Sequence, residues 1–319
     1  MNNRKYFLGV DGGGTKTTAV VFDESGNFVC KACGESINYY SVGLGSARTA
    51  MKSIINQLTV KEYACAVIGM SALNERATEE ETERFCSDII YAEKIIMDSD
   101  LFVALEAMGT EAECAAIISG TGSMAIYRDK CGNISHTGGW GYILGDEGSG
   151  YAIGLAGIKA AIKSAENCGP ETALFGECLK YFSIKNIYDL IDLYYEKTVS
   201  RKVTAAFAKV VYECAESGDE IAKSIISAEA KELANTTLGL FKEKAKETPV
   251  GLWGGVFQNN RFFRDEFISI LSSNEIENVK LIDFTPEVGA IFAGYKACGI
   301  EIVDFIKNNI KKSYTESNL

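Results

Sequence analysis

The stretch Gly9-Val10-Asp11-Gly12-Gly13-Gly14-Thr15-Lys16-Thr17 stands between two apolar runs, residues 6–8 and residues 18–22, and it decides the fold expected for this chain. Apolar runs on both sides of a glycine cluster predict a strand, a glycine-rich turn and a second strand. Consecutive glycines let the backbone approach a ligand closely and let successive N–H groups point into one concavity, as in an anion-binding nest. The turn is therefore a candidate phosphate site, to which Thr15 adds a hydroxyl donor.

A carboxylate stands at the end of the first predicted strand. Asp11 would repel a phosphate in the neighbouring turn unless Mg²⁺ stood between them. This combination predicts a metal nucleotide with Asp11 as the metal ligand. The spacing matches neither the P-loop nor the Rossmann pattern. Taken alone, the stretch is also compatible with an ordinary glycine hairpin.

Composition narrows the class of protein. The chain has 319 residues and a formal net charge of −11, and this length predicts about two domains. The acidic balance argues against a nucleic-acid partner, which requires a clustered basic surface. Only a short apolar run precedes Asp11 and no apolar stretch reaches membrane-spanning length. We therefore expect a cytoplasmic enzyme that acts on small molecules without a membrane partner; a homodimer stays open.

The chain contains 10 cysteines, most of them single and in apolar surroundings. This distribution is typical of reduced buried thiols, so we expect no disulfides. Cys30 and Cys33 have the spacing of a metal or redox pair. In the strand predicted there they would face opposite sides of the sheet, and no second pair supplies further ligands. We interpret them as ordinary strand residues.

The predicted elements of the first 113 residues follow the ribonuclease-H-like order of three strands and then alternating helices and strands. The expected strands are 6–10, 17–22, 28–33, 65–70 and 94–97, and the expected helices are 46–58, 79–90 and 101–108. The opening pattern then returns near residue 115. The matched residues are Ser119 with Asp11, Gly120 with Gly12, Gly122 with Gly14 and Ser123 with Thr15. This repeat indicates a duplication, in which two glycine nests would clamp one polyphosphate.

The second half of the chain continues with helices and a further glycine turn. The expected helices are 151–165, 186–197, 201–216, 219–246, 259–271, 287–298 and 302–311, with strands at 250–253 and 280–282. The turn at Gly254 and Gly255 opens onto a helix and offers backbone donors for a ribose or phosphate. We predict an α/β protein of two ribonuclease-H-like domains, residues 1–113 and residues 114–319, with the terminal helix packing on the first domain.

Taken together, these glycine motifs resemble those of the sugar kinase, actin and Hsp70 superfamily, and within it the N-acetylglucosamine kinase branch of the BadF/BadG/BcrA/BcrD ATPases. The motifs that carry the resemblance are Val10–Thr17, Ile118–Ser123, Gly138–Gly141, Gly145–Ser149 and Gly254–Val256. The resemblance implies an actin-like ATPase fold with a nucleotide cleft between its two domains. It also implies ATP and Mg²⁺ as cofactors, and phosphorylation of the 6-hydroxyl of N-acetylglucosamine or of N-acetylmuramic acid from cell-wall turnover.

The same resemblance assigns site residues. Those implied to bind ATP are Gly13, Gly14, Thr15, Lys16, Gly120, Thr121, Gly122, Gly254, Gly255 and Asn259. Those implied to bind the sugar are Asn38, Gly139, Trp140 and Asp146. For Trp140, the alternative is an aromatic residue of the core, since tryptophan is often buried for packing alone; the functional interpretation is an apolar wall for a sugar face or acetyl group.

The family's catalytic aspartate falls on Asp100. Phosphoryl transfer requires a carboxylate near the attacking hydroxyl, and Asp100 at the end of a predicted strand suits the role of general base. A structural alternative is that Asp100 only caps the following helix. The sequence also departs from the family pattern, because Ser99 stands where asparagine is usual, and Asp98 is a competing carboxylate.

Other functions remain as alternatives. An ATPase that activates an electron-transfer dehydratase or reductase would hold a [4Fe–4S] cluster, which needs converging thiolates. The cysteines near residues 114 and 131 do not form a pair on one helix face. A glucosamine kinase would differ from an N-acetylglucosamine kinase by one amide of its substrate. A regulatory sugar sensor would be expected to carry a helix-turn-helix segment or a basic surface.

Overall fold

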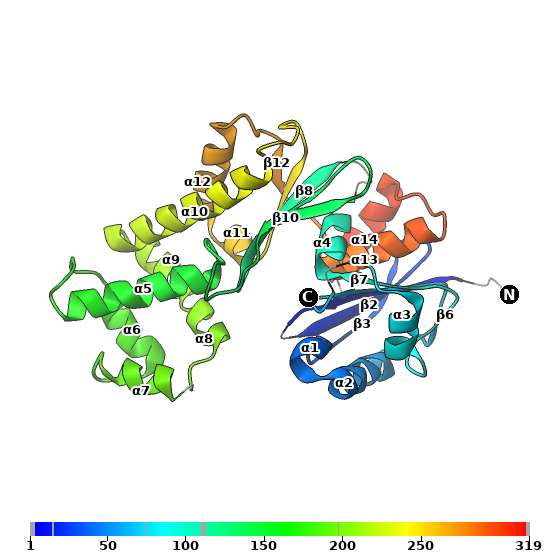
Figure 1. Cartoon of the computed structure of the whole chain (residues 1–319), viewed down its shortest axis with the longest axis horizontal. Coiled ribbons are helices and arrows are strands. Elements are labelled where there is room, and N and C mark those ends of the chain that lie inside the picture. Colours follow the sequence, from blue (N-terminus) through cyan, green and yellow to red (C-terminus); the bar gives the residue numbers. More distant parts are fainter. Residues whose placement is uncertain (1–3, 15, 74, 110–112, 197, 317–319) are drawn as a thin grey trace. The chain divides into compact units, whose positions relative to one another are not determined.

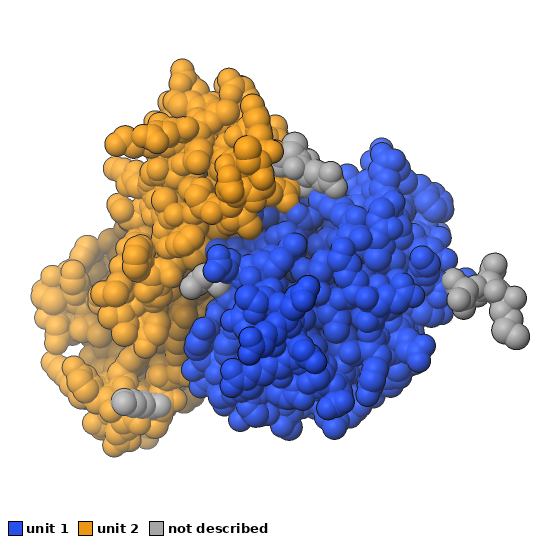
Figure 2. Space-filling view, turned by 45° about the vertical axis from the view of Figure 1, so that its right-hand side comes forward, with its two compact units in different colours: residues 1–112, 282–319 blue, residues 113–281 orange. Residues whose placement is uncertain are grey.

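The structure is a computed structural model that describes residues 4–14, 16–73, 75–109, 113–196 and 198–316. The chain forms two compact units (Figure 2): unit 1 comprises residues 1–112 and 282–319, and unit 2 comprises residues 113–281. The expected second domain, residues 114–319, therefore includes too much of the chain, because the segment from Ile282 onward packs with the N-terminal residues. No helix in the described ranges is long and apolar enough to cross a membrane.

Unit 1 is built on a five-stranded sheet with the order β3-β2-β1-β5-β7. Its strands are β1 (Tyr6–Gly12), β2 (Thr17–Asp23), β3 (Phe28–Gly34), β5 (Cys65–Met70) and β7 (Ile95–Ser99). The first three are antiparallel neighbours, whereas β5 and β7 run parallel to β1. Met70 pairs with Gly12 on one side and with Ser99 on the other. The carboxyl ends of β1, β5 and β7 therefore lie at one edge of the sheet.

Helices cover both faces of this sheet. One face carries α2 (Leu44–Gln57) and α3 (Glu79–Cys86), whose apolar residues share a core with Leu8 and Val10 of β1. The other elements of unit 1 are α1 (Tyr39–Val42), α4 (Asp100–Glu106), α13 (Pro286–Ala297), α14 (Asp304–Glu316) and the short strands β4 (Glu62–Tyr63) and β6 (Tyr91–Ala92).

Helix α13 belongs to unit 1 because small residues allow it to approach β1 and α4 closely. A Cβ atom at Gly9 would collide with the carbonyl oxygen of Glu287, and one at Gly289 would collide with the carbonyl oxygen of Val103. The helix also contacts β5. This close packing explains why the segment after residue 281 joins the first unit rather than the second.

Unit 2 repeats the topology of unit 1. Its sheet order is β10-β9-β8-β11-β12, with β8 (Cys114–Ser119), β9 (Ser123–Arg128), β10 (Ile134–Gly138), β11 (Val250–Trp253) and β12 (Val279–Leu281). Strands β8, β9 and β10 are antiparallel neighbours, and β11 and β12 run parallel to β8. The two sheets therefore have equivalent strand orders, which confirms the expected α/β fold of two ribonuclease-H-like units.

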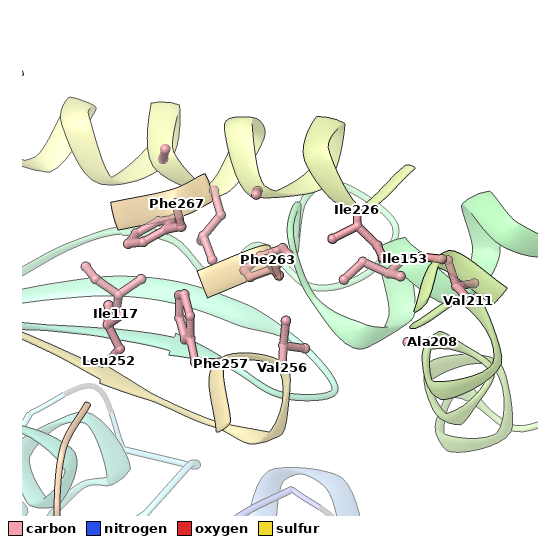
Figure 3. Packing of buried hydrophobic residues seen from close by; sticks show 14 of the residues in the cluster. Ile117, Ile153, Ala208, Val211, Ile226, Leu252, Val256, Phe257, Phe263 and Phe267 are labelled. Atoms are coloured by element: carbon pink, nitrogen blue, oxygen red, sulfur yellow. The ribbon is translucent and has the colours of Figure 1, made fainter. Parts of the chain in front are cut away.

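The helices of unit 2 are α5 (Gly150–Ala165), α6 (Leu174–Phe182), α7 (Asp189–Tyr195), α8 (Arg201–Ala206), α9 (Ala208–Glu216), α10 (Glu220–Leu240), α11 (Gly255–Asn259) and α12 (Arg261–Ser272). The long helix α10 packs alongside α12 (Figure 1). Figure 3 shows Ile117 and Leu252 of the sheet near Phe257, Phe263 and Phe267, all within one buried cluster. The segment expected as one helix over 201–216 is instead two, α8 and α9, joined at Phe207.

Candidate functional site

The first glycine loop leaves β1 in a conformation that hydrogen bonds hold. The backbone N–H of Ser71 donates to the carbonyl oxygen of Gly12 at 2.9 Å, and the hydroxyl of Ser36 donates to that of Gly13 at 2.9 Å. A Cβ atom at Gly12 would lie 2.6 Å from side-chain atoms of Ile37. The absence of a side chain at position 12 is therefore required for the loop to pack where it does.

The outer part of this loop is open. A Cβ atom at Gly14 would meet no atom within 4 Å, and the side chain of Lys16 is exposed. Thr15, which we predicted to touch ATP, lies outside the described residues. The geometry of Gly12 to Gly14 and of Lys16 is compatible with a loop that approaches a ligand, whereas contact with ATP stays a prediction.

Asp11 lies at the end of β1, directly before the loop. Burial is the largest cause that raises the pKa of its carboxyl from 3.8 to about 7, followed by the charges of Glu287 and Asp100, while Lys16 acts in the opposite direction. A cation at this position would relieve that unfavourable charge. Among the residues described, no group of three or more His, Cys, Asp or Glu could hold a metal ion. Mg²⁺ commonly uses only one or two carboxylates together with substrate phosphates, so Asp11 fits such a site.

The carboxylate of Asp100 does not cap the helix that it begins. The N-cap of α4 is Ser99, whose hydroxyl oxygen accepts a hydrogen bond from the backbone N–H of Phe102 at 3.1 Å. The interpretation of Asp100 as the N-cap is therefore wrong. Burial raises the pKa of Asp100 to about 6, although backbone N–H groups of Leu101 and of Asp100 itself lower it in part. Asp100 is half-buried and forms no ion pair with any described residue.

The competing carboxylate, Asp98, is already engaged. Its Oδ2 atom lies 3.1 Å from Nε of Arg76, and its Oδ1 atom accepts a hydrogen bond from the backbone N–H of Ser99 at 2.8 Å. The residue is 6% exposed. These contacts make Asp98 a structural carboxylate and leave Asp100 as the better candidate for proton transfer.

The side chain of Asn38 forms hydrogen bonds within unit 1. It is the N-cap of α1, and its Oδ1 atom accepts hydrogen bonds from the backbone N–H groups of Tyr40 at 3.1 Å and Ser41 at 3.2 Å. Its Nδ2 atom donates to the hydroxyl of Ser71 at 3.1 Å. Because Ser71 also holds Gly12, Asn38 is linked to the first glycine loop. A sugar contact by Asn38 stays a prediction.

The second glycine loop lies in unit 2, between β8 and β9. The backbone N–H of Gly120 donates to the carbonyl oxygen of Gly122 at 2.9 Å, and that of Gly150 donates to the carbonyl oxygen of Gly120 at 2.8 Å. The N-terminus of α5 is thereby attached to the loop. Gly254, with φ of +109°, supports it from another side, because a Cβ atom there would collide with the carbonyl oxygen of Ser119.

Four of the predicted ATP-binding residues line one cavity of about 710 Å³ in unit 2: Gly120, Thr121, Gly255 and Asn259. This volume is typical of a site for a small molecule. Asn259 is partly engaged, since its Nδ2 atom donates to the carbonyl oxygen of Gly255 at 2.9 Å. A second cavity of about 520 Å³, beside α3 and β7 in unit 1, contains none of the predicted site residues.

Two lysines that line the 710 Å³ cavity of unit 2 were not predicted from the sequence. Lys202 of α8 and Lys209 of α9 line it together with Tyr212. The charge of Lys202 suits a phosphorylated ligand, whereas Nζ of Lys209 lies 3.7 Å from Oε1 of Glu213, which also lines the cavity. No motif marks either lysine in the sequence, where the segment 201–216 has only the apolar spacing of a packed helix.

The glycine stretch after β10 contains the remaining predicted sugar contacts. Gly139 has φ of +74°, and a Cβ atom there would collide with Cε of Met124. The side chain of Trp140 is 73% exposed, so its interpretation as a core aromatic residue is wrong.

Asp146 is the opposite case, because it is 3% exposed. Its Oδ2 atom lies 2.5 Å from Nη2 of Arg201, and its carboxylate also accepts hydrogen bonds from the backbone of Ser123 and Gly141. Burial raises the pKa of Asp146 and the charge of Arg201 lowers it. Asp146 therefore joins the second glycine loop to the stretch that follows β10. Its contact with a sugar stays a prediction.

Comparisons with known proteins identify a family and similar chains. A family model described as the BadF/BadG/BcrA/BcrD ATPase family matches residues 8–294. The chain is 30% identical to an N-acetylmuramic acid/N-acetylglucosamine kinase of Clostridium acetobutylicum, over 92% of this chain and 99% of that protein. It is 28% identical to an N-acetyl-D-glucosamine kinase of Dictyostelium discoideum, over 90% of this chain and 97% of that protein.

Solved structures share the fold. A crystal structure from Porphyromonas gingivalis has a TM-score of 0.73 at 20% identity and covers 93% of this chain and 100% of its own. A ROK family glucokinase from Streptomyces griseus, in complex with glucose and AMPPNP, has a TM-score of 0.54 at 16% identity over 91% of this chain and 98% of its own. Because the family model extends over residues 8–294, the chain belongs to the BadF/BadG/BcrA/BcrD ATPase family.

Proposed function

We propose that this ATP-dependent sugar kinase transfers the terminal phosphate of ATP to the 6-hydroxyl of an N-acetylated amino sugar, with Asp100 as the general base. The observation that carries the proposal is the state of the Asp100 carboxyl. It stands at the carboxyl edge of the unit 1 sheet, it does not cap α4, and it has no ion pair within the described part of the chain. A carboxylate without an ion-pair partner is available to a substrate hydroxyl.

The substrate class rests on the relatives. The names of the two kinases from Clostridium acetobutylicum and Dictyostelium discoideum include N-acetylglucosamine, and the first also includes N-acetylmuramic acid. Both proteins align with at least 90% of this chain. These likenesses support N-acetylglucosamine and N-acetylmuramic acid as the substrates, and we assign Asn38, Gly139, Trp140 and Asp146 as the residues that bind them.

In the proposed reaction, Asp100 accepts the proton of the 6-hydroxyl as its oxygen attacks the terminal phosphorus of ATP, and ADP leaves. A pKa of about 6 keeps most of the carboxyl ionised at neutral pH and makes it a stronger base than an ordinary aspartate with a pKa of 3.8. The base need not be strong, because phosphoryl transfer depends mainly on positioning and on neutralisation of charge.

ATP would occupy the cavity lined by Gly120, Thr121, Gly255 and Asn259, where Lys202 contributes positive charge. Asp11 would hold Mg²⁺, which neutralises phosphate charge when it is bound. We propose that the other residues of the first glycine loop contact the phosphates of ATP, namely Gly13, Gly14, Thr15 and Lys16.

The first experiment measures ATP consumption with Mg²⁺ in the presence of N-acetylglucosamine, N-acetylmuramic acid, glucosamine or glucose, and the position of the phosphate in the product by ³¹P NMR. We expect turnover that requires an N-acetylated sugar and gives a 6-phosphate. Turnover that prefers glucosamine would move the assignment to a glucosamine kinase. ATP hydrolysis that no sugar stimulates would reject the proposal and favour the electron-transfer ATPase, for which iron content is the next measurement.

A further inference from the structure

Arg201 is held beside the second glycine loop by two contacts. It is the first residue of α8, and its Nη2 atom lies 2.5 Å from Oδ2 of Asp146. The guanidinium carbon lies 5.2 Å from the centre of the Tyr142 ring, in a cation–π contact. A salt bridge and an aromatic ring in contact with the guanidinium group define the position of this side chain.

The position is directly against the loop backbone. A Cβ atom at Gly122 would lie 2.6 Å from Nη2 of Arg201 and 2.7 Å from Oδ2 of Asp146. A glycine at position 122 is therefore what allows the ion pair to lie on the loop. The loop itself is the one whose residues Gly120 and Thr121 line the 710 Å³ cavity.

The two partners of this ion pair differ in how many of their hydrogen-bonding groups remain available to a ligand. Asp146 is buried, and backbone groups of Ser123 and Gly141 also donate to its carboxylate. The Arg201 side chain is 39% exposed. Its Nε and Nη1 atoms form no hydrogen bond within the described part of the chain, so donors of the guanidinium group remain for a ligand. Asp146 acts as an anchor and Arg201 presents a cation.

Helix α8 directs two successive cations to this loop. Lys202 lines the cavity, whereas Arg201 lies at Gly122. A nucleotide whose adenosine part is in the cavity would extend its phosphates along the loop toward Gly122. A guanidinium group with free donors in a planar fork matches the geometry of a terminal phosphate better than an ammonium group does.

Building on the proposed kinase function, we propose that Arg201 binds the terminal phosphate of ATP at the second glycine loop, with Asp146 as its anchor. Arg201 is then a catalytic residue for the transfer, because charge on the transferring phosphoryl group is stabilised by the guanidinium group. If Arg201 served only as a structural link between Asp146 and Tyr142, its replacement should affect the binding of ATP and ADP equally.

The test compares the dissociation constants of Mg·ATP and Mg·ADP for the wild type, Arg201→Met, Arg201→Lys and the control Arg261→Met. Arg261 is a matched control because its side chain is 84% exposed and pairs with Asp265 on its own helix. We expect Arg201→Met to weaken ATP binding about tenfold, while ADP binding changes by less than about twofold, because only ATP carries the terminal phosphate. Arg201→Lys should restore part of the difference.

Kinetics supply a second readout. Arg201→Met should lower kcat about 100-fold, as loss of one preorganised donor to a reacting group typically does, and Arg261→Met should leave it unchanged. Equal loss of ATP and ADP affinity, or no loss of either, would overturn the proposal. If Arg201→Met does not fold, the ratio of the dissociation constants of Mg·ATP and Mg·ADP is measured for Arg201→Lys instead and tests the proposal in the same way. A wild-type protein that binds ATP more tightly than ADP but phosphorylates no sugar would reject the kinase function and leave the phosphate contact standing.

Discussion

Nε of Arg76 lies 3.1 Å from Oδ2 of Asp98, and this ion pair separates the roles of two carboxylates that are neighbours in the sequence. Asp98 is 6% exposed and has a cation as partner. Asp100 stands two residues later, begins α4 and has no such partner among the described residues. Both oxygens of the Asp98 carboxylate are engaged, by Arg76 and by the backbone N–H of Ser99, so the pair directs the proposed chemistry to Asp100.

Replacement of Asp100 by asparagine should abolish most of the turnover. Asparagine preserves the size of the side chain but cannot accept the proton of the sugar hydroxyl, so we expect kcat to fall roughly 10²–10⁴-fold with little change in the KM for ATP. A coupled assay for ADP measures both constants. The matched control is Asp98→Asn, which should keep kcat within about threefold and lower the melting temperature, because it removes the ion pair between a buried carboxylate and Arg76. Equal losses of kcat in the two variants would contradict the assignment.

The rate should depend on the ionisation of Asp100. Burial raises its pKa to about 6, and only the ionised form can act as a base. Activity should therefore be constant at neutral pH and decline as the pH falls through about 6, by up to tenfold per pH unit. Measurement of kcat from pH 5 to pH 9 at saturating substrates provides the test. A decline that begins only near pH 4 would show that an ordinary carboxyl, or none, is involved.

The ionisation of Asp11 should affect stability in the opposite direction of pH, so that the free energy of unfolding falls as the pH rises. Folding raises its pKa from 3.8 to about 7, so in this interval the folded chain retains a proton that the unfolded chain has released. The contribution of Asp11 to the free energy of unfolding therefore becomes less favourable as the pH rises from about 4 to about 7. Without metal, Asp11→Asn should melt at a higher temperature than the wild type at pH 8, and the difference should shrink at pH 5.

The same variant tests the metal site by a route that does not depend on activity. If Asp11 holds Mg²⁺, addition of Mg²⁺ with a nucleotide should raise the melting temperature of the wild type more than that of Asp11→Asn. Differential scanning fluorimetry with and without EDTA measures this shift. Equal shifts in the two proteins would remove Asp11 from the metal site.

The local elements could be predicted from sequence because their signals are local. Glycines between β-branched runs predict both glycine loops, and the sheet orders confirm the duplication that this pattern indicates. Ser99 shows that local sequence signals also indicate where a helix begins. Serine is a preferred N-cap, so its position directly before Asp100 could have indicated the cap that the structure shows.

The remaining features depend on contacts between residues far apart in the chain. The small residues of α13 predict a close approach, but they do not specify Gly9 of β1, which lies more than 270 residues earlier, as the partner. Arg201 and Lys202 likewise have no signal of their own. They reach the second glycine loop because α8 packs against α5, and no periodicity or spacing encodes that packing.

Two glycines of unit 2 should respond differently to alanine. At Gly120 a Cβ atom would meet nothing within 4 Å, and the residue lines the cavity, so Gly120→Ala should fold normally and weaken ATP binding. At Gly254, with φ of +109°, a Cβ atom would collide with the carbonyl oxygen of Ser119, so Gly254→Ala should lower the melting temperature markedly. Thermal melts and nucleotide titrations separate the two effects. A stable Gly254→Ala protein with normal ATP affinity would show that the turn can rearrange.

The exposure of Trp140 allows its role to be tested without damage to the fold. Because the side chain is 73% exposed, Trp140→Ala should change the free energy of unfolding by no more than about 0.5 kcal/mol. If the ring forms a wall for the sugar or its acetyl group, the KM for N-acetylglucosamine should rise about tenfold, as for loss of one apolar contact of that size, while the KM for ATP stays constant.

Tyr195→Ala is the matched control for Trp140→Ala, because Tyr195 is an aromatic residue of unit 2 with 84% exposure and lies in α7, outside the proposed site. It should leave both KM values unchanged. Comparison of N-acetylglucosamine with glucose then separates the acetyl group from the sugar ring: a loss confined to the acetylated sugar places the ring of Trp140 against the acetyl group. Unchanged KM values for every sugar in Trp140→Ala would remove Trp140 from the substrate site, and the exposed ring would then need another partner.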